Sequence, residues 1–108
     1  RASGQFKPSL SIGPINLDMR GKRVAVDGEA IELTAYEFNL LEYLMQRPGE
    51  VVSKTELTEY LYEQDFDRDS NVIEVFVGRL RKKLDPENSL KPISTVRGQG
   101  YRLALSTT

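Results

Sequence analysis

The chain has 108 residues, of which 39% are hydrophobic and 29% charged, so it has the size and composition of one globular domain with its own core. It contains no cysteine and no histidine, which excludes disulfides, thiolate metal sites and catalytic or zinc-binding arrangements that need an imidazole. The net charge of −1 conceals a polarised chain: residues 1–70 carry 8 Lys and Arg against 13 Asp and Glu, whereas residues 71–108 carry 7 against 3. This basic C-terminal third is compatible with nucleic-acid binding, because affinity follows a local basic face rather than the total charge.

The N-terminal third predicts a linker followed by a small antiparallel sheet. Residues 1–14 are polar, contain Gly and Pro, and begin with Arg rather than Met, which favours a linker or tag remnant in a processed or excised chain. Three short alternating segments follow, at residues 15–18, 23–28 and 29–33. The last two meet at Asp27-Gly28, a dipeptide typical of two-residue hairpin turns.

Two helices are predicted next, each with a capping box at its start. Thr34 and Glu37 have the required spacing, and apolar residues then recur at helical intervals. Ser53 and Glu56 repeat the arrangement at the start of the second helix. An acidic loop, YEQDFDRD, follows at residues 62–69.

A third helix is predicted over residues 70–84, and its two faces differ. The apolar stripe consists of Ile73, Val77, Leu80 and Leu84, flanked by Phe76. The opposite face carries Asn71, Val75, Gly78, Arg79 and Lys82, with Glu74 at its border. Glycine costs about 1 kcal/mol inside a helix, so its place on this face favours close approach to another surface. These residue types contact base edges and thymine methyl groups in the major groove, although a helix with a merely solvated outer face has a similar pattern.

The chain ends in a predicted hairpin, ISTV-RGQG-YRLAL, whose tip carries Arg97 between two alternating segments. Gly98 and Gly100 are expected to permit unusual backbone angles and to keep the tip slim. A slim tip with an arginine suits the minor groove, which is about 6 Å wide and most negative over A·T-rich sequence. A surface hairpin that happens to carry an arginine is the alternative.

These segments carry a family resemblance. ELTAYEFNLLEYLMQRPGEVVSK, SNVIEVFVGRLRKKL and STVRGQGYRL resemble the DNA-binding domain of the OmpR/PhoB family of bacterial two-component response regulators, and VRGQGY and GRLRKKL lean toward its PhoP-like branch. The resemblance implies an α+β winged helix-turn-helix over residues 15–105, with a four-stranded N-terminal antiparallel sheet, a three-helix core and a C-terminal β-hairpin wing, followed by a tail at 106–108. It also implies sequence-specific binding of double-stranded DNA, with the helix at about 70–84 in the major groove and the wing at 97–100 in the minor groove.

The resemblance also assigns roles to individual positions. The base-reading positions are Asn71, Val72, Glu74, Val75, Gly78 and Arg79; the phosphate-binding positions are Arg81, Lys82 and Thr95; the wing residues are Arg97, Gly98, Gln99 and Gly100. Further basic contacts are expected from Lys83 and Arg102. Some family members have a long basic side chain where this chain has Gly78 and an arginine where it has Asn71, so the base sequence that it reads is not fixed by the resemblance.

The expected partners follow from the same resemblance. They are promoter direct repeats bound by a head-to-tail homodimer, a receiver domain N-terminal to this segment in a full-length cytoplasmic protein, and RNA polymerase. The polymerase contact is assigned to the acidic loop at 62–69, through Glu63, Asp65, Phe66 and Asp67. A solvated acidic loop fits those residues equally well. No membrane contact, metal or cofactor is expected.

Two other classes of function compete with DNA binding. A winged-helix module that binds protein, through the third helix or the acidic loop, is the alternative. An enzyme is disfavoured, because the sequence has no histidine, no cysteine, no phosphate-cradling glycine loop after a strand and no convincing carboxylate pair.

Overall fold

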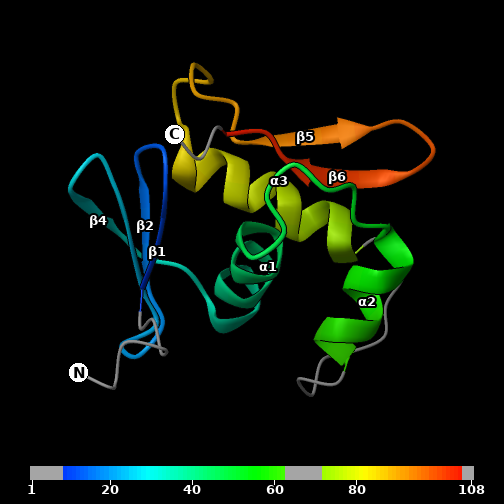
Figure 1. The fold of residues 1–108 in the computed structure, drawn as a ribbon, viewed down its shortest axis with the longest axis horizontal. Coiled ribbons are helices and arrows are strands. Elements are labelled where there is room, and N and C mark those ends of the chain that lie inside the picture. Colours follow the sequence, from blue (N-terminus) through cyan, green and yellow to red (C-terminus); the bar gives the residue numbers. More distant parts are fainter. Residues whose placement is uncertain (1–8, 63–71, 106–108) are drawn as a thin grey trace.

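The computed structural model describes residues 9–62 and 72–105, in which two antiparallel sheets flank three helices (Figure 1). In chain order the elements are β1 (Ser9–Ile12), β2 (Ile15–Asp18), β3 (Arg23–Val26), β4 (Glu29–Ile31), α1 (Ala35–Met45), α2 (Lys54–Tyr62), α3 (Val72–Leu84), β5 (Ile93–Val96) and β6 (Gly100–Leu103). This order confirms the predicted α+β winged-helix architecture. None of the helices in the described ranges has both the length and the apolar character needed to cross a bilayer.

The N-terminal sheet has the strand order β1-β2-β3-β4, with every neighbouring pair antiparallel. Its inner face is apolar; Leu17 and Val24 are cross-strand partners and both are buried. The predicted Asp27-Gly28 turn is present, with positive φ at both residues, as a tight two-residue hairpin requires.

The first strand corrects the predicted linker. Residues 1–14 were assigned to a linker, but Ser9–Ile12 form β1 and pair with β2. Leu10 and Ile12 alternate with two serines, so that Ile12 is buried while the serines are exposed. Such a short strand with a polar outer face resembles linker sequence, and only its pairing with β2 makes it part of the sheet.

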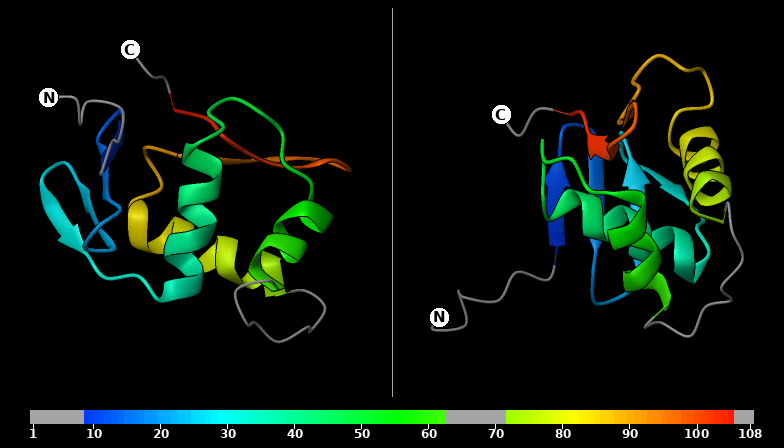
Figure 2. Two further views of the ribbon diagram at one scale, coloured as in Figure 1. Left: turned by 60° about the horizontal axis from the view of Figure 1, so that its bottom comes forward. Right: turned by 90° about the vertical axis from the view of Figure 1, so that its right-hand side faces the viewer.

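Helix α1 forms the centre of the core. In Figure 1 and in the left view of Figure 2 it stands between the N-terminal sheet and α2, and α3 packs across it. The predicted capping box is present: the Thr34 side chain accepts from the Glu37 amide, and the Glu37 carboxylate accepts from the Thr34 amide. The buried residues of this helix are Glu37, Phe38, Leu40, Leu41, Leu44 and Met45.

The second capping box is formed in part. The Ser53 hydroxyl accepts from the Glu56 amide at 3.0 Å, as predicted for the start of α2. The Glu56 carboxylate accepts from the Tyr43 hydroxyl on α1 at 2.5 Å. Glu56 therefore connects the first two helices.

The C-terminal hairpin is joined to the segment that connects α1 and α2. Val52 and Tyr101 exchange two backbone hydrogen bonds, of 2.8 and 2.9 Å, and the Gly49 amide donates to the Leu103 carbonyl at 3.2 Å. Gly98 lies at the tip with a φ of +74° and open space around it, in agreement with the predicted turn. Gly100 has a φ of +151°, as expected for a glycine with unusual backbone angles, and a Cβ there would lie 2.1 Å from the Val52 carbonyl oxygen. The second glycine, which pairs with Val96 directly after the turn, is therefore also needed for close packing against Val52.

Candidate nucleic-acid interface

Helix α3 has the two faces that the sequence predicted. Ile73, Val77, Leu80 and Leu84 are buried, each at most 2% exposed. The opposite side presents Glu74, Val75, Arg79 and Lys82 as exposed residues, and Gly78 is half-buried between them. Val75 is 46% exposed and, in residues 9–62 and 72–105, only Val51 is also classed as an exposed large hydrophobic residue. An apolar side chain thus lies on an otherwise polar surface.

The glycine of this helix is not required by the fold. Gly78 has ordinary helical backbone angles, and a Cβ built there would meet no described atom within 4 Å. Because alanine would be more favourable in a helix by up to about 1 kcal/mol, internal packing does not explain the glycine. The glycine is explained instead if another surface must come close to the helix at this point.

Glu74, in the first turn of α3, and the wing border the same hollow. This concavity has a volume of about 430 Å³ and lies between three parts of the chain: the start of α2, the exposed side of α3 and the hairpin. Its lining consists of Ser53, Lys54, Thr55, Glu74, Thr95, Val96, Gly98, Gln99, Gly100 and Tyr101. In Figure 1 the hairpin tip extends toward the end of the molecule where α2 lies and α3 begins.

An ion pair crosses the rim of the hollow. The Lys54 ammonium on α2 lies 2.7 Å from Oε2 of Glu74 on α3, and the two side chains are 51% and 45% exposed. The hydrogen bond to Glu74 raises the pKa of Lys54 above its usual value. Lys54 and its neighbours Ser53 and Thr55 were not among the predicted site residues. The Ser53 cap marks a helix start, and the first helix of a helix-turn-helix crosses the DNA backbone, so this signal was available.

Arg81 joins α3 to the hairpin. Its guanidinium donates to the Ile93 carbonyl from Nε at 3.2 Å and from Nη2 at 3.1 Å, and Nη2 also donates to the Thr95 hydroxyl at 2.6 Å. The side chain is half-buried. Arg81 was expected to bind phosphate, and its observed contacts are within the protein; they fix the position of β5 relative to α3.

We expect Arg81→Lys to loosen the wing while keeping the charge, because an ammonium cannot reproduce the fork that reaches both oxygens. Losing hydrogen bonds made by a charged donor costs about 1–2 kcal/mol here. Amide hydrogen exchange should become faster over residues 93–96, and Thr95→Val, which keeps the bonds to Ile93, should show a smaller increase. Unchanged exchange in Arg81→Lys would contradict this role.

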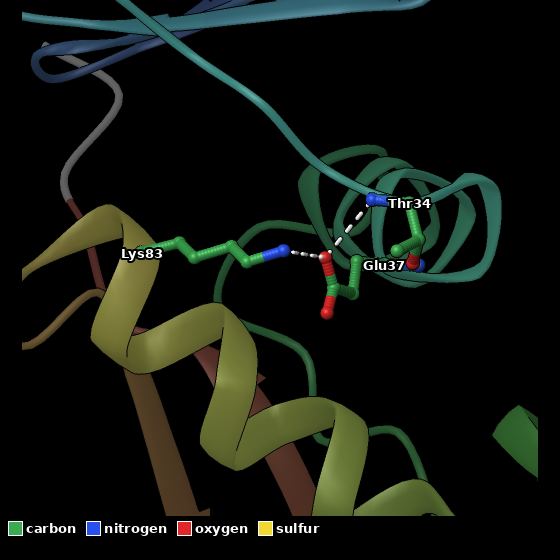
Figure 3. Close-up of polar contacts among 3 residues, drawn as sticks. All are labelled: Thr34, Glu37 and Lys83. Atoms are coloured by element: carbon green, nitrogen blue, oxygen red, sulfur yellow. Dashed lines mark hydrogen bonds and ion pairs between the residues drawn. The ribbon is translucent and has the colours of Figure 1, made fainter.

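Lys83, expected as a further DNA contact, forms an ion pair with α1, and its side chain is 37% exposed. Its ammonium points to Oε1 of Glu37 (Figure 3). The two atoms are 2.7 Å apart, and the Glu37 side chain is only 1% exposed. Burial alone raises the pKa of this carboxyl, but the bonds from Lys83 and Thr34 outweigh it and lower the pKa below the ordinary 4.5. Oε2 of Glu37 is buried without a partner in the described structure, so the carboxylate depends on Lys83. In the basic run at the end of α3, Arg81 and Lys83 therefore bind other parts of the protein, whereas Lys82 is exposed.

Several predicted site residues lie outside the part of the chain that the structure describes. They are Asn71 and the loop residues Glu63, Asp65, Phe66 and Asp67, together with the side chain of Val72. The wing residues Arg97, Gly98 and Gln99 are exposed, and Thr95 and Lys82 are exposed as well. Over residues 9–62 and 72–105, no cluster of three acidic, cysteine or histidine residues is arranged to hold a metal.

The four-stranded sheet, the three-helix core and the hairpin beside the third helix define a winged-helix domain. The family model for "Transcriptional regulatory protein, C terminal" matches residues 28–103. The chain therefore belongs to this family of transcriptional regulators, as a C-terminal winged-helix effector domain of the OmpR/PhoB type.

Individual relatives are consistent with that assignment. The chain is 50% identical over 101 residues to the two-component response regulator PhoP of Pseudomonas aeruginosa, covering 94% of this chain and 45% of the relative. It is 39% identical over 105 residues to the transcriptional regulatory protein PhoP of Escherichia coli K12, covering 97% of this chain and 47% of that protein. The chain thus spans about half the length of these curated relatives.

Solved structures share the fold. The DNA-binding domain of Klebsiella pneumoniae RstA, crystallised in complex with the RstA box, matches with a TM-score of 0.77 and 30% identity, covering 91% of this chain and 98% of that one. The Thermotoga maritima OmpR/PhoB homologue DrrB matches with a TM-score of 0.81 and 27% identity, covering 95% of this chain and 47% of that one.

Proposed function

We propose that this domain binds specific double-stranded DNA sequences as the effector half of a two-component transcriptional regulator. The observation that supports the proposal is the shared hollow, which is lined by Glu74 of α3 and by residues of the wing. A helix about 10–12 Å across fits a major groove about 12 Å wide. With α3 in that groove, the wing is positioned to enter the neighbouring minor groove with Arg97 at its tip.

The side chains on this face have the chemistry for both kinds of contact. Arg79 is exposed and suits guanine, and Val75 suits a thymine methyl group. The Thr95 hydroxyl accepts from Arg81, so its own hydrogen is directed away and can be donated to a phosphate oxygen. Lys82 is exposed on the same helix and is the proposed phosphate contact.

The proposal includes the partners of the longer protein. We infer an N-terminal receiver domain, a cytoplasmic location, and head-to-tail pairs of the domain on direct repeats. RNA polymerase is the inferred partner of the loop at 62–69, which lies outside the described residues. A protein-binding role for α3 remains the alternative, and salt dependence separates the two.

Selection of binding sites from random duplexes, followed by titration at several salt concentrations, tests the function. We expect a defined sequence preference and a log affinity that falls with log salt by about 0.9 per neutralised phosphate. Arg79→Ala should relax the base preference and cost about 1–3 kcal/mol on the selected site. Lys82→Met, its control, should weaken binding on all sequences alike. A wild-type domain with neither preference nor salt dependence would favour the protein-binding alternative.

Gly78→Ala should separate stability from binding. We expect the free domain to become more stable by about 1 kcal/mol, because alanine is the better helix former and meets no neighbour. Affinity for the selected DNA site should fall, since the added methyl group keeps α3 farther from the base edges. Thermal unfolding and a DNA titration of the same sample give both values, and an unchanged affinity would show that the glycine is not needed for close approach.

A further inference from the structure

The Lys54–Glu74 ion pair is positioned where DNA backbone must pass. If α3 lies in the major groove and the wing in the adjacent minor groove, the phosphate strand that separates these grooves crosses between them. The hollow lies between those elements, and both members of the pair line it. This step, and those that follow, rest on the proposed function.

The pair contributes little to folding. Both side chains are about half exposed, and exposed ion pairs are screened by water and salt. A carboxylate beside a phosphate strand would also repel it, so Glu74 weakens binding unless its charge is balanced. Lys54 provides that balance at 2.7 Å, and the cost is that its own charge is no longer fully available to the backbone.

We propose that Glu74 sets the sequence selectivity of the domain by withholding Lys54 from the backbone of non-cognate DNA. Where the bound sequence presents a cytosine amino group to α3, the carboxylate accepts from that group, and cytosine N4 is the base-edge donor that Glu prefers. Lys54 is then released to a phosphate of the same strand. One base contact thus adds one phosphate contact, and Lys54 becomes a specificity-determining residue that touches no base.

The test is a double-mutant cycle on a duplex of unrelated sequence, using Glu74→Gln, Lys54→Met and the combined variant. Glu74→Gln keeps the size of the side chain and an acceptor oxygen but frees Lys54. The salt slope, which is the slope of log affinity against log salt concentration, should therefore steepen by about 0.9, and the affinity for random sequence should rise. Between about 50 and about 200 mM salt, the loss of affinity should grow roughly threefold. Lys54→Met alone should leave the slope near wild type, and the combined variant should return to it.

Lys82→Met is the matched control, because Lys82 is an exposed lysine on α3 without a carboxylate partner in the described structure. It should lower the slope by about 0.9 whether position 74 is Glu or Gln. On the selected site, Glu74→Gln should reduce the ratio of specific to random affinity. Thermal unfolding should be nearly unchanged in all variants.

Two results would overturn the inference. One is a slope in Glu74→Gln equal to that of the wild type. The other is that Lys54→Met changes the salt slope equally with Glu or with Gln at position 74. That result would mean that the two charges act on DNA independently. Both results require a wild-type domain that shows sequence preference and salt dependence, so they are distinguishable from failure of the proposed function.

Discussion

Gly100→Ala is expected to destabilise the domain by about 2–5 kcal/mol, which is the largest effect of a single methyl group that we predict. The added Cβ would lie 2.1 Å from the Val52 carbonyl oxygen and 2.8 Å from the Ser53 Cα, and both are backbone atoms that cannot rotate away. The φ of +151° at this position adds strain for any residue with a side chain. Relief requires separation of Val52 from Tyr101, and with it loss of their two hydrogen bonds.

Gly98→Ala is the matched control, two residues away in the same hairpin. Gly98 has a positive φ, but a Cβ built there would have no described atom within 4 Å. Alanine should therefore cost only about 1–2 kcal/mol of folding free energy. Chemical denaturation of both variants measures the difference, and near-equal losses would show that packing against Val52 is not the cause. Hydrogen exchange of the Tyr101 amide should accelerate in Gly100→Ala alone.

Lys83→Met is expected to cost about 3 kcal/mol, because it leaves the buried Glu37 carboxylate without its ion partner. The adjacent Lys82→Met removes the same charge from the exposed side of α3 and should change the free energy of unfolding very little. Equal stabilities of the two variants would contradict the structural role of Lys83.

The pH dependence of the same variants gives an independent check. The pKa of Glu37 is lowered in the folded state, so its contribution is present above about pH 4.5 and is lost as the pH falls through the folded-state pKa. In Lys83→Met, burial dominates and the pKa of Glu37 should rise, so protonation then favours the folded state. The difference in stability between wild type and variant should therefore shrink on acidification, as urea titrations from pH 7 to about pH 4 would measure.

Local signals in the sequence were sufficient for most of the fold. Capping at Thr34, the Asp27-Gly28 turn and the apolar stripe of α3 each depend on residues close together in the chain, and all three are confirmed. Strand β1 was missed because its pairing with β2, rather than its own composition, decides its structure.

The site shows the same division between local and long-range information. The exposed side of α3 follows from helical periodicity, but the partners of its charged residues come from elsewhere in the chain. Arg81 bonds to β5, Lys83 to α1 and Glu74 to α2, and nothing near these residues in the sequence indicates which of them faces inward. The close approach of Val52 to Gly100 was likewise not predictable from local sequence, because the two residues are far apart in the chain.

The bridge between Val52 and Tyr101 has a consequence for how such regulators diversify. It attaches the wing to the connection between α1 and α2, so the conformation of that connection sets the tilt of the wing. A change of residue there can shift where the arginine lands along the duplex while every contacting side chain stays the same.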